Sequence, residues 1–388
     1  MIGKQQWLAL VRGNRWTLAK VSGRRKNLKI HQIFEFEGES AFQREEFDEL
    51  DDAEIMPPVH NNPEQDWLDS TANLKKWLRK QRVPLKKVKY TLSCPGVITR
   101  MITLPKLTNK DLEKLLTEQV DQYFTLNISD YIVEYRILEK VQEEGQERLR
   151  VLLVAIPLNE WEKQWKRWDS IGVTPKLVDF SADCICRLYR YLSGWGEDKN
   201  QVPVADMAIV DLGKDRVELV LIEHGVFFLY SDMDISLGDF LEQGETGVLT
   251  EPAEKDELSE LLETNELGNP NEPIKLFEEI EPIELVDHDE TNVPDELEVR
   301  LLPVFNTLSE FLNFFASRHY GKSVDQIFIT GECADYANLE ALFEKNMGIQ
   351  SRVGFPEDWR PKFTRKSRDF AEQWMKYGSL YGLAIRED

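Results

Sequence analysis

Long apolar runs are absent from this sequence. No stretch approaches the roughly 20 consecutive apolar residues that a membrane-spanning helix needs. The first apolar run is short and is interrupted by Arg12, unlike the apolar core of a secretory signal. Cysteine is also scarce, with 4 residues in a chain of 388. We therefore expect a cytoplasmic chain with reduced thiols, which reaches a membrane only through partners.

Recognisable catalytic and metal-binding motifs are missing as well. The sequence has no Walker A, GxSxG or GxGxxG pattern, and its 5 histidines lack HxxxH or HExxH spacing. Cys184 and Cys186 are two residues apart on a predicted helix and would point to different faces. Cys333 follows a glycine turn, where a buried inert thiol is more common than a reactive one. We predict no catalytic residue and no metal site.

Positive charge is in deficit. The chain has 48 Lys and Arg against 70 Asp and Glu, which gives a formal net charge of −22. This balance argues against a nucleic-acid partner, because phosphate recognition depends on basic patches. Residues 241–296 alone hold 19 of the acidic residues and two lysines. Like charges at this density favour a solvated segment, so we expect a flexible acidic insertion there.

A repeated α/β pattern is present. Three short strands joined by glycine turns are predicted between residues 7 and 36, and a similar set between 207 and 230. A strand–helix–strand–strand unit is predicted over about 93–157, where Thr108 and Asp111 mark the start of its helix. Two similar halves in one chain favour an internally duplicated α/β fold.

Four stretches of this pattern carry a resemblance to a known family. They are the segment from Leu104 to Leu138, Ala208 to Gly213 (AIVDLG), Ile327 to Gly331 (IFITG) followed by Asn338 and Leu339, and Tyr381 to Arg386 (YGLAIR). In order and spacing the chain resembles the PilM family of type IV pilus assembly proteins and, more distantly, the cell-division protein FtsA.

The resemblance implies an actin-like fold, in which a ribonuclease H-like α/β unit occurs twice as two lobes facing each other across a cleft. It implies a first lobe over residues 1–204 with an inserted subdomain over about 93–157, and a second lobe over 205–366 that contains the acidic insertion. A C-terminal helix over 367–388 would return to the first lobe. PilM-like proteins bind ATP in the cleft and receive the N-terminal peptide of the inner-membrane protein PilN on the first lobe.

The resemblance also assigns candidate nucleotide-binding residues to three turns: Gly13, Asp211, Gly213, Thr330 and Gly331. Glycine at such turns lets backbone N–H groups approach phosphate oxygens. Each turn departs from the family pattern. Val11 stands where an acidic residue would orient hydrated magnesium, Lys214 stands where a hydroxyl is expected, and Glu332 puts a carboxylate in place of a glycine. We expect hydrolysis to be lost, and we leave binding of ATP and magnesium open.

Simpler interpretations of several residues stay open. Asp211 and Gly213 also fit an ordinary tight hairpin with a solvated aspartate. Arg12 and Arg15 are placed to contact a phosphate or a partner carboxylate, although exposed arginines in turns usually do neither. Trp161, Trp165 and Trp168 have helical spacing, which is typical of a core stripe and less often of an exposed docking patch.

Two further segments are candidate partner surfaces. The late strands of the inserted unit, residues 131–138 and 149–156, are candidates for a sheet edge that takes a peptide strand. Eight basic residues between Lys75 and Lys89 precede that unit. They fit a solvated helix face, a face toward anionic lipid headgroups, or a contact for the acidic segment 241–296.

Our leading hypothesis is a cytoplasmic scaffold of a type IV pilus, secretion or DNA-uptake machine, at the inner face of the cytoplasmic membrane. It would bind the N-terminal tail of a PilN-like inner-membrane protein and other platform or motor components. One alternative is an active actin-like ATPase or ATP-dependent switch. Another is a cytoplasmic platform component of a type II secretion system.

Overall fold

The computed structural model describes residues 5–23, 27–38, 63–124, 127–143, 145–194, 205–238 and 296–386. The predicted acidic insertion lies outside the described residues, except for its last residue, with which α7 begins.

The first lobe is built on a six-stranded sheet. In spatial order its strands are β14 (Lys362–Phe363), β3 (Lys29–Glu37), β2 (Arg15–Ser22), β1 (Gln6–Arg12), β4 (Val88–Ser93) and β8 (Val178–Phe180). β3, β2 and β1 form an antiparallel meander, and β4 and β8 continue the sheet parallel to β1. β1 is buried from Leu8 to Val11, which explains its uninterrupted apolar run, since a strand covered on both faces has no polar side.

The second lobe repeats this plan. Its strands in spatial order are β11 (Val226–Met233), β10 (Val217–Glu223), β9 (Met207–Leu212), β12 (Gln326–Thr330) and β13 (Ser351–Val353). Again a three-stranded antiparallel meander is extended by parallel strands. The two sheets share one connectivity, so the predicted duplicated, two-lobed α/β fold is confirmed.

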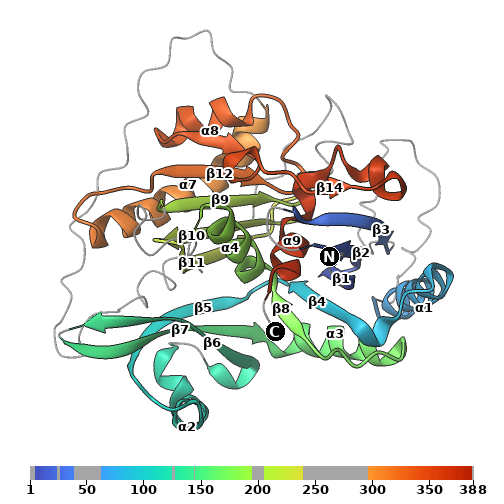
Figure 1. Ribbon diagram of the computed structural model, residues 1–388, viewed down its shortest axis with the longest axis horizontal. Coiled ribbons are helices and arrows are strands. Elements are labelled where there is room, and N and C mark those ends of the chain that lie inside the picture. Colours follow the sequence, from blue (N-terminus) through green and yellow to red (C-terminus); the bar gives the residue numbers. More distant parts are fainter. Residues whose placement is uncertain are drawn as a thin grey trace, which may run out of the picture.

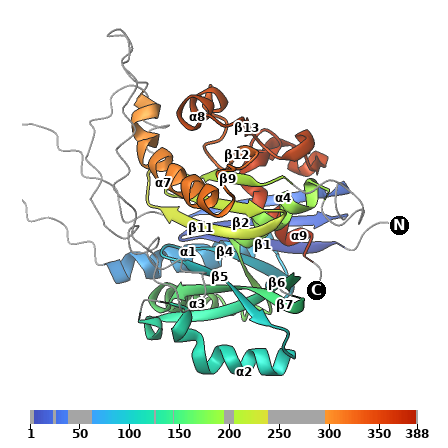
Figure 2. The same cartoon turned by 90° about the vertical axis from the view of Figure 1, so that its left-hand side faces the viewer.

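Helices fill the space between the sheets and cover them outside. α4 (Ser181–Leu192) and α9 (Gly378–Ala384) lie between the two sheets (Figure 1). α7 (Glu296–Arg318) packs on the second sheet on the side away from α4 (Figure 2), where α8 (Leu339–Met347) contacts it. α1 (Pro63–Gln81) and α3 (Leu158–Ser170) flank the first sheet. Short 3₁₀ helices are η2 (Leu85–Lys87), η3 (Val120–Tyr123), η4 (Ile128–Asp130), η5 (Pro356–Asp358), η6 (Arg365–Phe370) and η7 (Trp374–Tyr377).

The C-terminal segment differs from the predicted helix over 367–388. Only Gly378–Ala384 is α-helical, because Thr364 and Ser367 cap η6 as a separate turn. α9 packs so closely on α4 that a Cβ at Gly382 would lie 1.7 Å from the Cys184 carbonyl oxygen. Backbone contact at this distance needs glycine.

The inserted subdomain is a three-stranded sheet covered by one helix. It consists of β5 (Ile98–Pro105), α2 (Asn109–Gln119), β6 (Tyr131–Glu143) and β7 (Gln146–Pro157), with β7 in the centre. Its own apolar core includes Ile102, Leu112, Leu116, Val151 and Leu153. The predicted start of α2 is confirmed, since the Thr108 hydroxyl accepts a hydrogen bond from the Asp111 N–H at 3.2 Å.

The prediction of two exposed strand edges in the subdomain is half wrong. Residues 149–156 lie in β7, which pairs with both β5 and β6 and therefore has no free edge. Residues 131–138 lie in β6, at the edge of this sheet.

The division of the chain at residues 204 and 366 into two lobes and a C-terminal segment remains a proposal, although β14 at Lys362–Phe363 joins the first-lobe sheet rather than the second. Within the described residues, no helix is both long enough and apolar enough to cross a lipid bilayer. The tryptophan stripe on α3 is mixed in character: Trp168 is fully buried, whereas Trp165 is 43% exposed.

Candidate functional site

The first-lobe side of the candidate site is the hairpin turn between β1 and β2. Gly13 has φ +54°, and Arg12 pairs with Arg15 across the turn. Two-residue hairpin turns favour glycine where φ is positive. Arg167 of α3 donates to the Gly13 carbonyl oxygen and to Asn14 Oδ1, both at 2.7 Å. Arg167 therefore fixes the turn. The sequence analysis missed it, because its spacing on α3 resembles that of an ordinary surface cation.

The second-lobe side is formed by the ends of β9 and β12. These strands are parallel, and Thr330 pairs with Asp211, so their carboxyl ends meet. Gly331 has φ +109°, and a Cβ there would lie 2.3 Å from Asp211 Oδ1 and 2.5 Å from the Leu212 carbonyl oxygen. Thr330 Oγ1 turns away and donates to the Met375 carbonyl oxygen at 3.0 Å. The structure thus brings Asp211 and Gly331 together but directs Thr330 elsewhere.

Ion pairs join the two sides. Arg12 Nη2 lies 2.7 Å from Asp211 Oδ2, and Arg15 Nη1 lies 2.5 Å from Glu332 Oε2. Arg15 Nη2 is also 2.7 Å from Asp215 Oδ2, and Arg12 Nη1 is 3.9 Å from Glu332 Oε2. We call these five residues the inter-lobe ion cluster. Both cations come from the first lobe and all three carboxylates from the second, so the cluster bridges the lobes directly.

Backbone donors of the second-lobe turn are already engaged. The Lys214 N–H donates to Glu332 Oε2 at 3.1 Å, and the Gly213 N–H donates to the Arg216 carbonyl oxygen at 3.0 Å. Glu332 therefore has two guanidinium groups and one backbone N–H around its carboxylate. These are the groups that hold phosphate oxygens in nucleotide sites. A phosphate would have to displace Glu332 from them.

Burial sets the electrostatics of the cluster. Burial alone would lower the pKa of Arg12, but Asp211 and Glu332 outweigh it and raise that pKa above its usual value. Burial would raise the pKa of Glu332, yet Arg12, Arg15 and the Lys214 N–H lower it overall. Burial, with Glu218 and Glu332 nearby, raises the pKa of Asp211 to about 6 against the opposing effect of Arg12. Arg12 and Glu332 are thus held in their charged forms.

Two of the simpler interpretations are wrong. Asp211 is 3% exposed, so it is not the solvated aspartate of an ordinary hairpin. Arg12 and Arg15 are not free turn residues, because they contact carboxylates of the other lobe. The nucleotide-binding role of Gly13, Asp211, Gly213, Thr330 and Gly331 stays a prediction.

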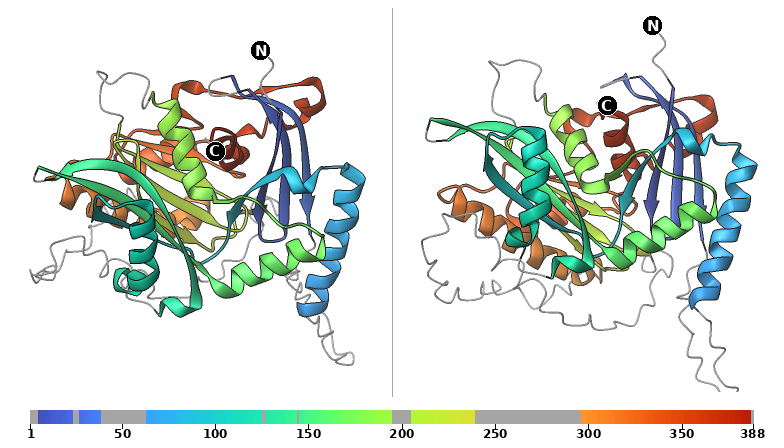
Figure 3. Two further views of the ribbon diagram at one scale, coloured as in Figure 1. Left: turned by 60° about the horizontal axis from the view of Figure 1, so that its bottom comes forward. Right: turned by 90° about the horizontal axis from the view of Figure 1, so that it is seen from below.

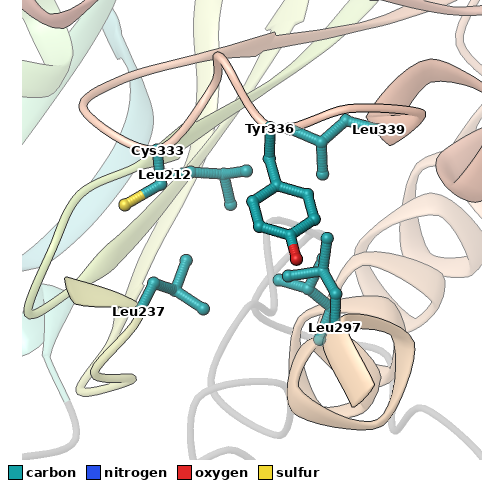
Figure 4. A pocket seen from close by; sticks show the side chains of 7 residues that line it. Leu212, Leu237, Leu297, Cys333, Tyr336 and Leu339 are labelled. Atoms are coloured by element: carbon teal, nitrogen blue, oxygen red, sulfur yellow. The ribbon is translucent and has the colours of Figure 1, made fainter. Parts of the chain in front are cut away.

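An apolar pocket lies next to the cluster (Figure 4). It is lined by Leu212, Leu237, Leu297, Leu301, Cys333, Tyr336 and Leu339. Its cavity volume of about 10 Å³ leaves room for at most about one water molecule. Burial raises the pKa of the Cys333 thiol to about 12, which agrees with an inert thiol. Over the described ranges, no group of three or more His, Cys, Asp or Glu is arranged to hold a metal ion.

Comparison with known proteins identifies the relatives of this chain. Residues 57–233 match the family model described as type IV pilus assembly protein PilM. Over these residues the chain is similar to PilM. A solved structure of a PilM–PilN type IV pilus biogenesis complex shares its fold, with a TM-score of 0.62, 15% identity, and coverage of 99% of both chains.

Other solved structures resemble this chain less closely. A Bacteroides thetaiotaomicron protein with an actin-like ATPase fold and unknown function has a TM-score of 0.45 and 11% identity, over 99% of this chain and 97% of the other. The cytoplasmic domain of EpsL, an inner-membrane component of the Vibrio cholerae type II secretion system, has a TM-score of 0.33 and 11% identity, over 60% of this chain and 71% of the other.

Proposed function

We propose that this chain is a scaffold of a type IV pilus assembly machine, placed at the inner face of the cytoplasmic membrane by a PilN-like partner. The family match supports the assembly role. The observation that carries the proposal is the inter-lobe ion cluster, which joins the lobes through side chains alone. A scaffold needs a fixed surface rather than a chemical step.

The cleft of this scaffold is, in our proposal, a degenerate nucleotide site. Arg12 supplies positive charge beside Asp211, where an ATPase would hold a metal ion. Glu332 supplies the negative charge that a phosphate would bring to Arg15 and the Lys214 N–H. The residues present therefore do not fit magnesium-bound ATP, and no step of the proposed function uses it.

We place the partner at the edge of β6. This strand has 13 residues and, among the strands that the structure describes, pairs only with β7. An edge strand offers unpaired backbone groups that a peptide in extended conformation pairs with. Arg136 of β6 forms an ion pair with Asp183 of α4, which holds the strand against the first lobe. This edge suits the N-terminal tail of a PilN-like membrane protein.

The test is fluorescence anisotropy with a labelled synthetic tail of the PilN-like protein encoded in the same genome. In an antiparallel edge strand, successive N–H groups alternate between the neighbouring strand and solvent. Of Val133→Pro and Glu134→Pro, one therefore removes an outward N–H and the other an N–H bonded to β7. The outward variant should keep the wild-type melting temperature and lose tail binding.

The other proline variant is the control. It removes an N–H that is bonded to β7, so it should lower the melting temperature. If the wild-type chain does not bind the tail at any accessible concentration, the proposed partner is wrong. If it binds and neither folded variant weakens the complex, the β6 edge is not the docking site.

A further inference from the structure

A basic corner stands out on an otherwise acidic chain. Residues 70–110 contain 11 Lys and Arg and no Asp or Glu. Six of these cations gather at the end of α1, on the turn that follows and on η2, and all six side chains are exposed. We define the basic corner as Lys76, Arg79, Lys80, Arg82, Lys86 and Lys87.

These six cations have no carboxylate partner among the described residues, whereas neighbouring cations do bond. Lys75 Nζ donates to the Ser170 carbonyl oxygen at 2.7 Å and so ties α1 to the end of α3. Lys106 pairs with Glu147 at 2.8 Å. The basic corner is thus a concentration of positive charge that the described fold leaves uncompensated.

Helix electrostatics explains only part of this charge. Cations in the last turn of a helix interact favourably with its dipole, which accounts for Arg79 and Lys80. Arg82, Lys86 and Lys87 lie beyond the helix, where the dipole no longer acts on them. Like charges so close together repel one another, so the corner is electrostatically unfavourable within the described part of the fold. An external anionic surface would relieve that repulsion.

The position of the corner suits a flat partner. α3 runs from the inserted subdomain to the corner formed by α1, which projects at the rim of the molecule in both views of Figure 3. The subdomain and the corner are both visible from this side (Figure 3, right). A helix end at the rim can approach a plane, and charges that lie farther than roughly 8 Å from the plane are largely screened by salt.

We propose that the basic corner docks on an anionic phospholipid surface. Clusters of four to eight Lys and Arg bind anionic headgroups, and each cation near the surface strengthens binding by about fivefold. This goes beyond the expectation that the chain reaches a membrane only through partners. It does not depend on the proposed PilN-like partner, because lipid alone is the ligand.

The test is cosedimentation of the full chain with vesicles of phosphatidylcholine, with and without phosphatidylglycerol. The quadruple variant Lys76→Gln, Arg79→Gln, Lys80→Gln, Lys87→Gln removes four cations of the corner. A matched control removes four exposed cations near β14 and η6: Lys362→Gln, Arg365→Gln, Lys366→Gln, Arg368→Gln. We expect the wild-type chain to bind only vesicles that contain phosphatidylglycerol, and salt to weaken this binding. The corner variant should bind them about tenfold or more weakly, whereas the control variant should bind them as the wild type does.

Three results would overturn the proposal. The first is no sedimentation of the wild-type chain with anionic vesicles at low salt. The second is an equal loss in both quadruple variants, which would indicate net charge rather than the corner. The third is a chain that does not bind vesicles and in which, without lipid, Lys76 or Lys87 forms zero-length cross-links to residues 241–296. That result would show that the acidic segment, and not a lipid surface, contacts the basic corner.

Discussion

At the scale of residues, single groups determine how the two lobes meet at the candidate site. Glycine at the end of β12 lets the backbone pass beside Asp211, and the charged side chains on either side then reach each other. The sequence located the turns, because glycine and aspartate mark turns whatever surrounds them. It did not predict the pairs Arg12–Asp211 and Arg15–Glu332, whose members are 199 and 317 residues apart. Contacts at such separations depend on how the lobes pack.

Replacing Gly331 tests the close approach in the cleft. Gly331→Ala places a Cβ on Asp211 and on the Leu212 carbonyl at a positive φ, so we expect a loss of more than about 2 kcal/mol in the free energy of unfolding. Gly348→Ala is the control, since φ is +65° there and no atom lies within 4 Å. It should cost about 1 kcal/mol. Equal losses in urea denaturation would show that the contact with Asp211 is unimportant.

Asp232 makes stability depend on pH. Burial and the nearby Glu218 raise its pKa to about 6 from 3.8, against the effect of Arg216. Its contribution to stability is therefore full below the unfolded pKa near 4 and is lost as pH rises through about 6. Between pH 4 and 7 the wild type should lose up to about 3 kcal/mol relative to Asp232→Asn, which cannot titrate. A difference between the two proteins that stays constant with pH would contradict this.

At the scale of elements, local signals were the most informative. Strands with turns on both sides and helices with caps were predictable because their causes lie within a few residues. The C-terminal segment was not, since its apolar residues suit a helix while Thr364 and Ser367 cap a separate turn. Which of the two late strands of the subdomain lies at the sheet edge was also beyond the sequence, because strand order in a sheet is a tertiary property.

The cap of α2 illustrates a local signal with a measurable effect. Thr108→Ala removes the acceptor of the Asp111 N–H, so we expect the subdomain to lose about 1 kcal/mol. Amide exchange within Asn109–Gln119 should speed up accordingly. Thr117→Ala, farther along the same helix, is the control, because its hydroxyl donates only to the Glu113 carbonyl within the helix. Equal exchange in both variants would mean that the cap contributes nothing.

At the scale of the whole molecule, the sequence predicted the internal duplication but not how the two lobes are arranged relative to each other. Two similar meanders in sequence indicated two similar sheets. How the lobes face each other depends on α4 and α9 between them and on the inter-lobe ion cluster, which combine residues from both ends of the chain.

A double-mutant cycle measures the bridge between the lobes. Arg15→Ala and Glu332→Ala each remove one member of a partly buried ion pair, while Arg15 keeps Asp215 and Glu332 keeps Arg12 as a second partner. We expect both to destabilise the chain, and the double variant to lose less than the sum, with a coupling energy of about 1 to 3 kcal/mol. Additive losses in urea denaturation would mean that the pair does not join the lobes.

We propose that side-chain ion pairs replace magnesium-bound ATP in joining the two lobes. Isothermal titration calorimetry of the full chain with ATP and magnesium, repeated with Asp211→Ala, tests this. We expect no saturable heat for either protein. Micromolar binding by the wild type that Asp211→Ala abolishes would contradict the proposal and would establish a nucleotide-dependent switch instead.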